Sequence, residues 1–327
     1  MNSGIGIAVL GFGMACAIAA ASLPGWRSLC RRWGHVDDPG HRKIHGRPVP
    51  LAGGFAVLTG WLLGGLLIGW VGGMESLKTQ WPSVMAGGGD GLRHLGVFAA
   101  GALGMVFLGA WDDRQDLGAG TKFLVQAVIA TGVAIWGVRA PFPESFGVAG
   151  HVLTILWILG VTNAFNLSDN MNGLCAGLGL IGAVGVVVGS LSGQGGHWGL
   201  ACLAAVTAGS LAGYLPFNYP RASVFLGDAG SQWVGFVLSG LALLHATNVR
   251  MSGGGWLQTA VAAAVVVAVP LMDTVFVTIS RTCRGQPFWV GDTQHLSHRL
   301  ARTALGKPGA VAVLWALGVV LAVLLRS

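Results

Sequence analysis

The chain has 327 residues, of which 53% are hydrophobic and only 9% are charged, and its formal net charge is +7. Soluble domains carry roughly 25% charged residues, so this composition excludes an ordinary soluble protein. It predicts an integral membrane protein made of one domain, residues 1–327. The five cysteines are scattered without CxxC or Cys/His spacing, which argues against a disulfide framework and against a zinc site.

Apolar runs along the chain predict an all-α fold of about ten transmembrane helices. The runs cover residues 3–23, 51–73, 94–111, 122–138, 151–163, 173–191, 197–216, 231–247, 257–280 and 308–325. The fifth run is short for the ~20 residues that a crossing helix needs. Positive charges follow the first run and do not precede it, which predicts an uncleaved span with the N-terminus outside.

Lysine and arginine are distributed unevenly between the loops. The loops after the odd-numbered runs hold 14 of the 19 basic residues, and eight of the 12 acidic residues lie in the same loops. Basic residues concentrate on the cytoplasmic side of membrane proteins, so we place these loops in the cytoplasm and both termini outside. This orientation explains the net positive charge without a nucleic-acid partner, and it predicts that the chemistry takes place at the cytoplasmic face.

The first cytoplasmic loop reads GHVDDPGHRKIHGRPVPLAGG (Gly34–Gly54). Its prolines and glycines predict turns rather than a long helix. Arg42, Lys43, His45 and Arg47 form a dense basic cluster within it. Such a cluster can clamp phosphates or lie against anionic lipid headgroups, and both interpretations are open.

Three carboxylates, Asp112, Asp113 and Asp116, follow the third apolar run in WDDRQDLGAGTKFLVQ (Trp111–Gln126). Adjacent carboxylates repel each other, so at neutral pH they favour a cation, and a divalent metal with bound phosphate meets that need. Lys122 is placed to meet the anionic partner of such a metal. The alternative is a solvated hairpin between two helices.

A polar patch separates two apolar runs in TNAFNLSDNMNGLCAGL (Thr162–Leu178). Its hydrogen-bonding side chains are Asn163, Asn166, Ser168, Asp169, Asn170 and Asn172. Six such side chains are too many for a lipid-facing segment, and they predict a wet cavity. A broken helix that merely bends is the alternative.

Two further acids stand next to or inside apolar segments. Asp228 lies between Gly227 and Gly230, just ahead of an apolar helix. A glycine-flanked acid there suits a metal ligand, and the free N–H groups of the helix start attract phosphate, but a simple helix cap is equally consistent. Asp273 lies inside the ninth run, where an acid is either functional or a hydrogen-bonded packing residue.

The last cytoplasmic loop is RGQPFWVGDTQHLSHRLARTALGKPG (Arg284–Gly309). A short helix is predicted to begin at Asp292 or Thr293 and to end at Gly306 and Pro308. On one face of this helix the sequence places His295, His298, Arg299 and Arg302. The face can bind lipid headgroups, but the paired histidines favour phosphate recognition in a site.

In this order the motifs resemble those of the polyprenyl-phosphate N-acetylhexosamine-1-phosphate transferases. The matching segments are DDPGHRKIHGRPVPLAGG, the DD…L…K…Q pattern, NAFNLSD, FLGDAGS…GF, PLMDT and H-L-x-H-R-L, which extend across the whole chain. The last motif is closest to the branch that acts on simple UDP-sugars, the undecaprenyl-phosphate N-acetylglucosaminyl-1-phosphate transferases.

The resemblance implies a multi-pass enzyme of the bacterial cytoplasmic membrane whose active site faces the cytoplasm. It would transfer a sugar 1-phosphate from a UDP-sugar to polyprenyl phosphate, release UMP and start a cell-envelope polysaccharide. Magnesium, or manganese in its place, would be the cofactor, and membrane lipid would surround the protein. Whether the protein forms a homodimer is left open.

The resemblance also implies roles for individual residues. Asp112, Asp113 and Asp169 would be the catalytic acids. Asp228 would hold the metal together with Asn166. The substrate-binding residues would be Lys122, Asn163, Asn166, Asn172, Arg42, Lys43, His45, His295, His298 and Arg299.

The chain departs from the family pattern in two places. Family members usually read D-G-x-D-G where this chain has DNMNG (Asp169–Gly173), and H-x-H-H where it has HLSH (His295–His298). Asn172 thus replaces an acid used around the nucleotide base, and Ser297 replaces a histidine, so the identity of the donor is open. A catalytically weakened relative that acts as a scaffold is one alternative function.

A second alternative is an ion-coupled transporter, but such proteins usually carry their acids near the membrane midplane and often show internal repeats, of which we find none.

A phosphate that attacks a diphosphate brings anions together, so the reaction needs a metal and cations at the membrane boundary. We expect polyprenyl phosphate to attack the β-phosphorus of the donor directly. A covalent aspartyl-phosphate intermediate is the rival mechanism.

Overall fold

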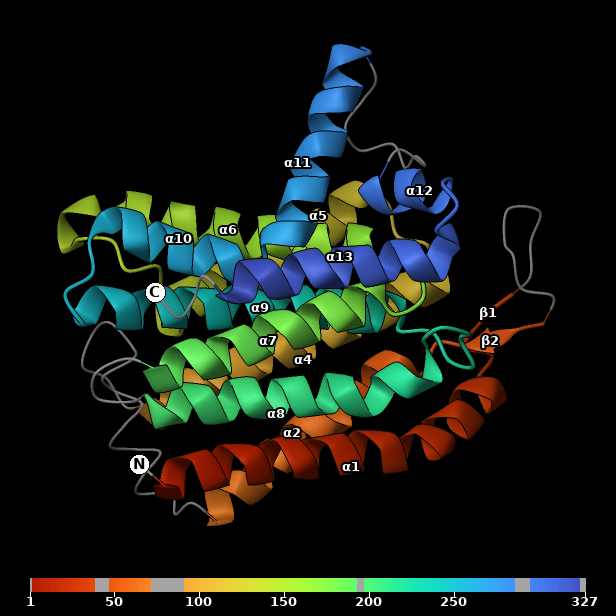
Figure 1. Cartoon of the computed structure of the whole chain (residues 1–327), viewed down its shortest axis with the longest axis horizontal. Helices are drawn as coiled ribbons and strands as arrows, with labels where there is room; N and C mark the ends of the chain where they lie inside the picture. The colour runs from red at the N-terminus through yellow and green to blue at the C-terminus, as the bar shows by residue number, and fades with distance from the viewer. Residues whose placement is uncertain (1, 39–46, 72–90, 193–196, 286–294, 324–327) are drawn as a thin grey trace.

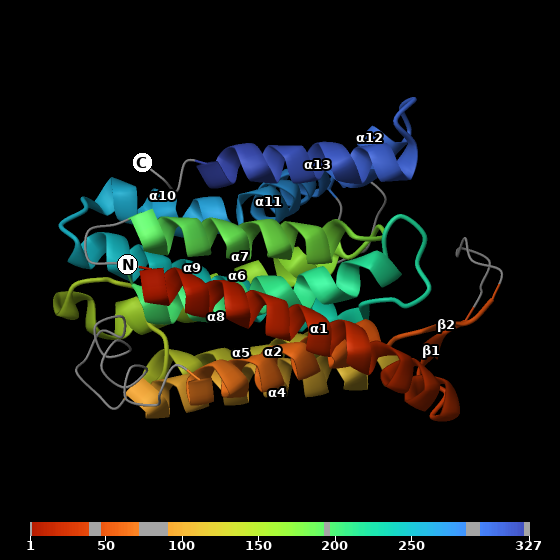
Figure 2. The same cartoon turned by 60° about the horizontal axis from the view of Figure 1, so that its bottom comes forward.

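The computed structural model describes residues 2–38, 47–71, 91–192, 197–285 and 295–323, and within them the fold is almost entirely helical. Most of the helices lie side by side along one axis (Figures 1 and 2). The long helices are α1 (Asn2–Arg32), α2 (Gly53–Val71), α4 (Gly91–Gln115), α5 (Ala119–Trp136), α6 (Gly147–Ser168), α7 (Leu174–Ser192), α8 (Trp198–Tyr214), α9 (Gly227–Met251), α10 (Trp256–Val266), α11 (Ala268–Cys283) and α13 (Gly306–Val323). Shorter elements are α12 (Leu296–Ala301) and the 3-10 turns η1 (Glu144–Phe146) and η2 (Leu215–Phe217).

The number of membrane crossings agrees with the sequence prediction. In the described part of the chain, nine helices are long and apolar enough to cross a membrane, and the count rises to ten if α10 and α11 form one crossing. Each predicted apolar run falls on one of these helices or on this pair. The fifth run, predicted to be short, belongs to the 22-residue helix α6, because the polar patch continues the same helix.

The ninth run, 257–280, is not one straight helix. It consists of α10 and α11, which meet at an angle of 85°, and α11 projects from the bundle (Figure 1). In a continuous helix the nitrogen of Pro270 would face the carbonyl of Val266, but proline has no N–H and its ring clashes there. The chain instead leaves helical geometry at Val267 (φ −125°, ψ 18°), and Pro270 falls in the first turn of α11.

Helix α9 forms the centre of the bundle. In its apolar window 83% of the residues are buried, against 22% in α1, α5 and α13, so these three helices form part of the surface that faces lipid. Aromatic pairs hold its neighbours: Trp233 packs edge-on against Trp61 of α2, and Phe236 stacks on Phe98 of α4 with ring centroids 5.2 Å apart. The start of α9 is therefore fixed relative to several helices.

Close approach of α4 and α2 to the first turn of α9 depends on glycine. A Cβ atom on Gly109 would lie 2.3 Å from the backbone of Asp228, and one on Gly54 would lie 2.5 Å from the nitrogen of Gly230. The loop before α2 contains a short antiparallel pair, β1 (Val36–Asp37) with β2 (Val49–Pro50). The carbonyl of Pro50 accepts the N–H of Phe225, just ahead of α9. The acids of α4 and α9 are thus brought to one end of the bundle.

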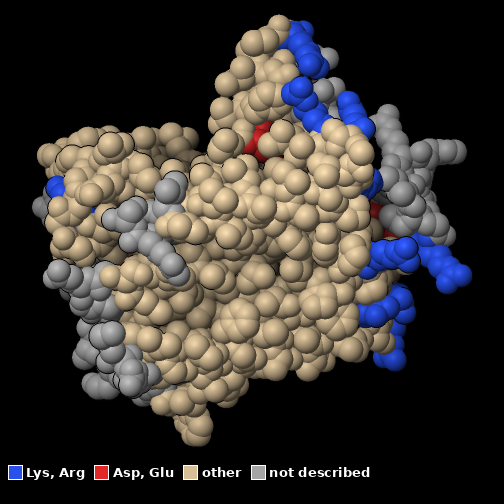
Figure 3. Space-filling model, viewed as in Figure 1, with Lys and Arg blue, Asp and Glu red and all other residues tan. Residues whose placement is uncertain are grey.

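The two ends of the bundle differ in charge. Helix α1 begins and α13 ends at the end opposite to β1 and β2 (Figure 1). On the face seen in Figure 3, lysine and arginine side chains gather at the end that carries β1 and β2 and along the outer part of α11. This separation matches the uneven distribution of basic residues between the loops.

Candidate active site

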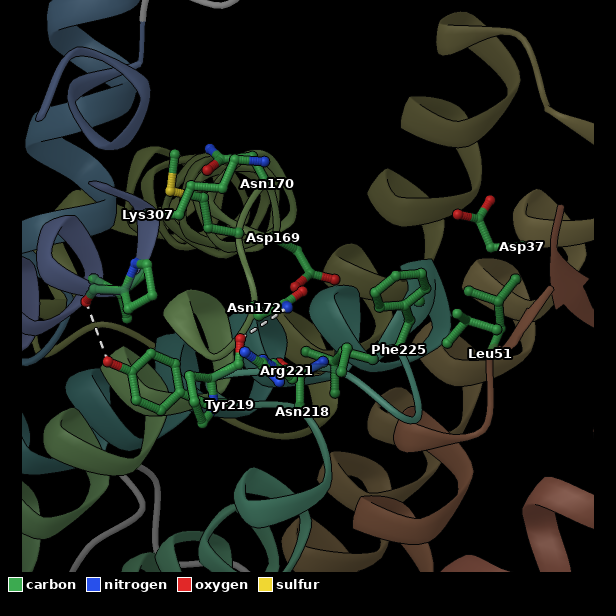
Figure 4. A pocket seen from close by; sticks show the side chains of 18 of the residues that line it. Asp37, Leu51, Asp169, Asn170, Asn172, Asn218, Tyr219, Arg221, Phe225 and Lys307 are labelled. Atoms are coloured by element: carbon green, nitrogen blue, oxygen red, sulfur yellow. Dashed lines mark hydrogen bonds between the residues drawn. The ribbon is translucent and has the colours of Figure 1, made fainter. Parts of the chain in front are cut away.

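A cavity of about 750 Å³ opens at the end of the bundle that carries β1 and β2. Figure 4 shows it from close by. Its polar lining residues include Asp37, Asp113, Asp169, Asn170, Asn172, Asn218, Tyr219, Arg221, Asp228, His298 and Lys307. Asp113, Asp169 and Asp228, to which the resemblance assigned roles in one active site, therefore share one cavity although they come from different helices or loops.

Lys122 lies at the centre of a charged network beside this cavity. Its Nζ is 2.6 Å from Oδ2 of Asp112 and 2.6 Å from Oδ2 of Asp228, and it donates a third hydrogen bond to Oδ1 of Asn166 at 3.0 Å. These three contacts use all three donors of an ammonium group. The sequence suggested that Lys122 would contact an anionic substrate, but the structure places it on the two acids, whose mutual repulsion it reduces.

Asp113 caps the start of α9, whereas its neighbour in sequence, Asp112, contacts Lys122. Its Oδ1 accepts the N–H of Asp228 at 2.8 Å, and its Oδ2 accepts the N–H of Ala229 at 3.2 Å. Gly227 has a φ of +72°, and a Cβ there would lie 2.8 Å from Asp113 Oδ2. The carboxylate thereby satisfies two of the unpaired N–H groups at the positive end of the helix. Asp113 links the end of α4 to the position of Asp228.

His35 lies behind Asp113. Its side chain is buried and its Nε2 is 3.7 Å from Asp113 Oδ2. Burial, and then the positive charge of Arg114, lower the pKa of His35 below its usual value. The lowered pKa favours the neutral imidazole beside Asp113.

Asp169 has a different environment. It is the residue that ends α6, its N–H bonds the carbonyl of Asn166, and its carboxylate points into the cavity (Figure 4). Burial raises the pKa of Asp169 well above its usual value, and the charges of Asp228 and Asp113 raise it further. A cation or a proton in the cavity is therefore needed to offset its charge.

The asparagines of the polar patch have three different positions. Asn166 donates from Nδ2 to Oδ1 of Asp228 at 2.9 Å and so orients that carboxylate. Asn172 donates to the carbonyl of Pro220 at 3.2 Å and lines the cavity. Asn163 does not line it, because it lies one turn earlier on α6 and donates to Gln126 Oε1 at 2.9 Å. The patch is therefore partly a wall of the cavity and partly a contact between helices.

Only part of the predicted basic face of α12 reaches the cavity. His298 lines it, whereas His295 is buried beside α11 with its Nδ1 2.8 Å from Oδ2 of Asp273. Oδ1 of Asp273 accepts the N–H of Leu296 at 2.7 Å, so this acid holds the start of α12. Arg299 is exposed and lies over the ring of Phe276, with 5.1 Å between its Cζ and the ring centroid.

The boundaries of this region differ from the sequence prediction in one respect. Helix α12 ends at Ala301, and Gly306 begins α13 instead of ending the preceding helix. Gly306 has a φ of +60°, which lets the chain turn between the two helices. The predicted starting residues Asp292 and Thr293 lie outside the described residues.

The basic cluster of the first loop also lies largely outside the described residues. Arg42, Lys43 and His45 belong to the part of the chain that is not described, so their phosphate-binding or lipid-binding role stays a prediction.

Several lining residues were not predicted from the sequence. Asn218 accepts the N–H of Gly173 and donates to the carbonyl of Val224, so it joins the two sides of the cavity floor. Tyr219 donates its hydroxyl to the carbonyl of Pro308 at 3.1 Å (Figure 4). The available signal was the segment NYPRAS, which contains one of only two tyrosines in the chain.

The described residues hold carboxylates for a metal ion only in small numbers. In these ranges no group of three His, Cys, Asp or Glu side chains is close enough to hold a metal ion by itself. Magnesium is often bound by only one or two carboxylates, and water and substrate phosphates supply the other ligands. The side chain of Asp228 is 34% exposed in the cavity, so it fits this mode of binding. Asn166 accepts a hydrogen bond from Lys122 and donates one to Asp228, so it supports Asp228, and its role as a second metal ligand stays a prediction.

Comparison with known proteins agrees with this arrangement. Residues 95–246 match the pattern of glycosyl transferase family 4. The chain is 32% identical over 298 residues to a probable undecaprenyl-phosphate N-acetylglucosaminyl 1-phosphate transferase of Bacillus subtilis, an alignment that covers 89% of this chain and 76% of the relative.

Two further relatives have similar names. A decaprenyl-phosphate N-acetylglucosaminephosphotransferase of Mycolicibacterium smegmatis is 31% identical, with 93% of this chain and 78% of the relative covered. An undecaprenyl-phosphate alpha-N-acetylglucosaminyl 1-phosphate transferase of Yersinia pestis is 30% identical, with 84% and 72% covered. The chain therefore belongs to glycosyl transferase family 4, the polyprenyl-phosphate N-acetylhexosamine-1-phosphate transferases, as its motifs predicted.

Proposed function

We propose that the protein is a phosphotransferase that moves N-acetylhexosamine 1-phosphate from a UDP-sugar to polyprenyl phosphate and releases UMP. The observation that carries this proposal is the convergence of Asp113, Asp169 and Asp228 on one cavity at the end of a membrane-spanning bundle. The relatives that name a polyprenyl phosphate and an N-acetylglucosamine group support the same reaction. An acid-rich cavity at a bundle end suits a lipid acceptor that stays in the bilayer and a donor that comes from solution.

The reaction brings a phosphate monoester against a diphosphate, so the site has to offset several negative charges. Lys122 supplies one positive charge and holds Asp112 and Asp228 in place. Asp228 is the residue that we expect to hold a magnesium ion, with Asp169 close enough to interact with the same charge. A bound magnesium ion would neutralise charge on the transferred phosphate group and polarise it.

We assign the reaction to a direct attack. An oxygen of polyprenyl phosphate forms a bond to the β-phosphorus of the donor, and the bond between that phosphorus and the oxygen bridging to the α-phosphate breaks, so UMP leaves. The oxygens of Asp112 and Asp113 already accept hydrogen bonds from Lys122, from the N–H of Leu117 and from the start of α9. Asp169, whose carboxylate points into the cavity, is therefore the acid that we expect to accept a proton of the lipid phosphate.

The active site faces the cytoplasm in this proposal. The cavity lies at the end of the bundle where basic side chains gather on the face seen in Figure 3, and the loops that the sequence predicts to be cytoplasmic hold 14 of the 19 lysines and arginines. A nucleotide-sugar is charged and does not cross a membrane unaided. A donor made in the cytoplasm therefore has to be bound from the cytoplasmic side. Both points support a location in the bacterial cytoplasmic membrane.

The test is UMP release by the purified protein in detergent with polyprenyl phosphate and a set of UDP-sugars. We expect UMP with UDP-N-acetylglucosamine and magnesium, and none after EDTA treatment until magnesium or manganese is restored. If no UDP-sugar yields UMP while the protein stays folded, the enzyme assignment is wrong and a scaffold is favoured. Ion-coupled solute uptake into proteoliposomes without UMP release would instead favour a transporter. A labelled phosphoenzyme formed from donor alone would overturn the direct attack.

A further inference from the structure

A hydrogen bond connects the two segments on either side of the cavity mouth. Ser297 on α12 donates its hydroxyl to Oδ1 of Asn170 at 2.8 Å, across 127 residues of sequence. Nδ2 of Asn170 donates to the carbonyl of Leu167 at 2.9 Å, which fixes the orientation of the amide so that its oxygen faces Ser297. Ser297 is only 1% exposed, so water does not compete for this contact.

This hydrogen bond affects the position of His298, the next residue along α12. Asn170 and His298 both line the cavity, whereas the Ser297 side chain points from α12 to Asn170. Helix α12 has only six residues, too few to be stable alone, so its position depends on what holds it. Asp273 holds its start, and Asn170 holds it from the side of the cavity.

The chemistry of His298 makes its position important. Burial lowers the pKa of His298, and the neighbouring His295, Lys307 and Arg302 lower it further. A neutral imidazole binds through one donor and one acceptor, and such hydrogen bonds weaken steeply when their angles change. A small displacement of α12 would therefore reduce the affinity of His298 for a ligand in the cavity.

Both members of this bond stand where the chain departs from the family pattern. Asn170 occupies a position at which the pattern has glycine, and Ser297 occupies one at which it has histidine. A glycine offers no side chain to accept the serine hydroxyl, so the bond requires both departures together.

We propose that Asn170 and Ser297 act together as positioning residues that hold His298 against the UDP-sugar donor. The proposal rests on the proposed function for the identity of the donor. It predicts that the two side chains act on donor binding as a unit and that they have little effect on the acceptor, which stays in the membrane.

A double-mutant cycle tests this. Ser297→Ala, Asn170→Ala and the double variant are assayed for UMP release, with kcat and the KM of each substrate determined separately. We expect each single variant to raise the donor KM by about three- to tenfold, the effect of one lost hydrogen bond, with kcat and the acceptor KM within twofold of wild type. We expect the double variant to be no worse than either single variant, because the same bond is lost.

Ser210→Ala is the matched control. Ser210 is fully buried in α8 and its hydroxyl bonds only the carbonyl of Thr207 in its own helix, so we expect no change in donor KM. The melting temperature of every variant is measured to identify those that are not folded. Dissociation constants for UDP-N-acetylglucosamine, measured by calorimetry on the same four proteins, give a second readout of the cycle.

The outcomes separate this inference from the proposed function. If wild type releases no UMP from any UDP-sugar, the proposed function fails, and the calorimetric cycle still decides whether the pair acts on nucleotide-sugar binding. The inference is overturned if the single variants keep the donor KM and dissociation constant within twofold of wild type. It is also overturned if their effects multiply in the double variant, or if the acceptor KM rises equally.

Discussion

The two walls of the cavity are built differently. One wall is formed where the ends of α4, α5, α6 and α9 meet, and behind it Lys122 contacts Asp112 and Asp228 at 2.6 Å and Asn166 at 3.0 Å. The other wall is formed by the turn after α6, residues 218–221, α12 and the start of α13. Its parts are joined by single hydrogen bonds such as those of Tyr219 with Pro308 and of Ser297 with Asn170.

This difference suggests a division of labour. Groups that act on the reacting phosphates have to keep their geometry, and the helix ends of the first wall are fixed by close packing and by the Asp113 cap. Groups that recognise a donor have to differ between family members, and single hydrogen bonds between loops can change without disturbing the bundle. Changes to the first wall should therefore reduce kcat, and changes to the second should raise the donor KM.

The largest effect is expected for Asp228→Asn. Loss of this carboxylate removes the residue expected to hold magnesium, and we expect kcat to fall by about a thousandfold, since a bound metal contributes several kcal/mol. Asp116→Asn is the control, because Asp116 is exposed on the turn after α4. UMP release at saturating donor measures both. A kcat within tenfold of wild type for Asp228→Asn would remove this acid from the reaction.

A large effect is also expected for Lys122→Met. The substitution removes the cation that contacts Asp112 and Asp228, and Asp112 stays buried. Breaking a buried ion pair costs about 3–5 kcal/mol. We expect a lower melting temperature together with a lower kcat. Asp112→Asn in the Lys122→Met background should restore part of the melting temperature, because Asp112, the more buried of the two acids, then carries no unpaired charge. If the double variant melts below Lys122→Met, the ion pair is not what stabilises this wall.

A smaller effect on stability, with a defined pH dependence, is expected for Asp169→Asn. Burial and the charges of Asp228 and Asp113 raise the folded pKa of Asp169 above the unfolded value of about 3.9. The folded state therefore keeps a proton that the unfolded state releases, and the wild type loses stability as the pH rises from about 4 through the folded pKa. Without divalent cations, Asp169→Asn should melt higher than wild type, and by more at pH 8 than at pH 5.

Thermal unfolding in EDTA measures this difference. Magnesium should reduce it or reverse its sign, because a bound cation stabilises the ionised carboxylate of the wild type. Asp116→Asn again serves as the control. A melting difference for Asp169→Asn that does not change with pH would contradict the assigned environment.

The smallest effect is expected for Tyr219→Phe. It removes one hydrogen bond, to Pro308, and leaves the ring that packs against Trp315. We expect the donor KM to rise by about two- to fivefold with kcat unchanged, because one such bond contributes about 1 kcal/mol. Tyr214→Phe alters the only other tyrosine, which is buried and does not line the cavity. A fall in kcat for Tyr219→Phe alone would place this residue in the reaction.

The sequence predicted the first wall well and the second poorly. Asp113, Asp169 and Asp228 were identified because each follows or precedes an apolar run, and run ends on one side of a membrane lie near each other. The partners of Lys122 were not predictable, because spacing along the chain does not say which distant acid a flexible side chain reaches. The same limit applies to His295, which shares a helical face with His298 but binds Asp273.

The bend between α10 and α11 could not be predicted from hydropathy either. The run 257–280 is apolar throughout its length, and an apolar run looks the same whether it crosses the bilayer or turns within it. Pro270 was a signal for a break, but proline is common enough in membrane helices that it does not fix an angle. Contacts of α11 with other helices determine its direction.

This bend connects the protein to the thickness of its bilayer. Helix α10 has 11 residues and is therefore only about 16 Å long, half of a hydrocarbon core of about 30 Å. Helix α11 continues at 85° to α10, and Met272, Val275 and Ile279 are exposed on it, so if α10 lies along the membrane normal these side chains would face acyl chains. Because α11 also carries Asp273, which holds the start of α12, a thinner or more tightly ordered leaflet that tilts α11 would shift the histidine at the mouth of the cavity.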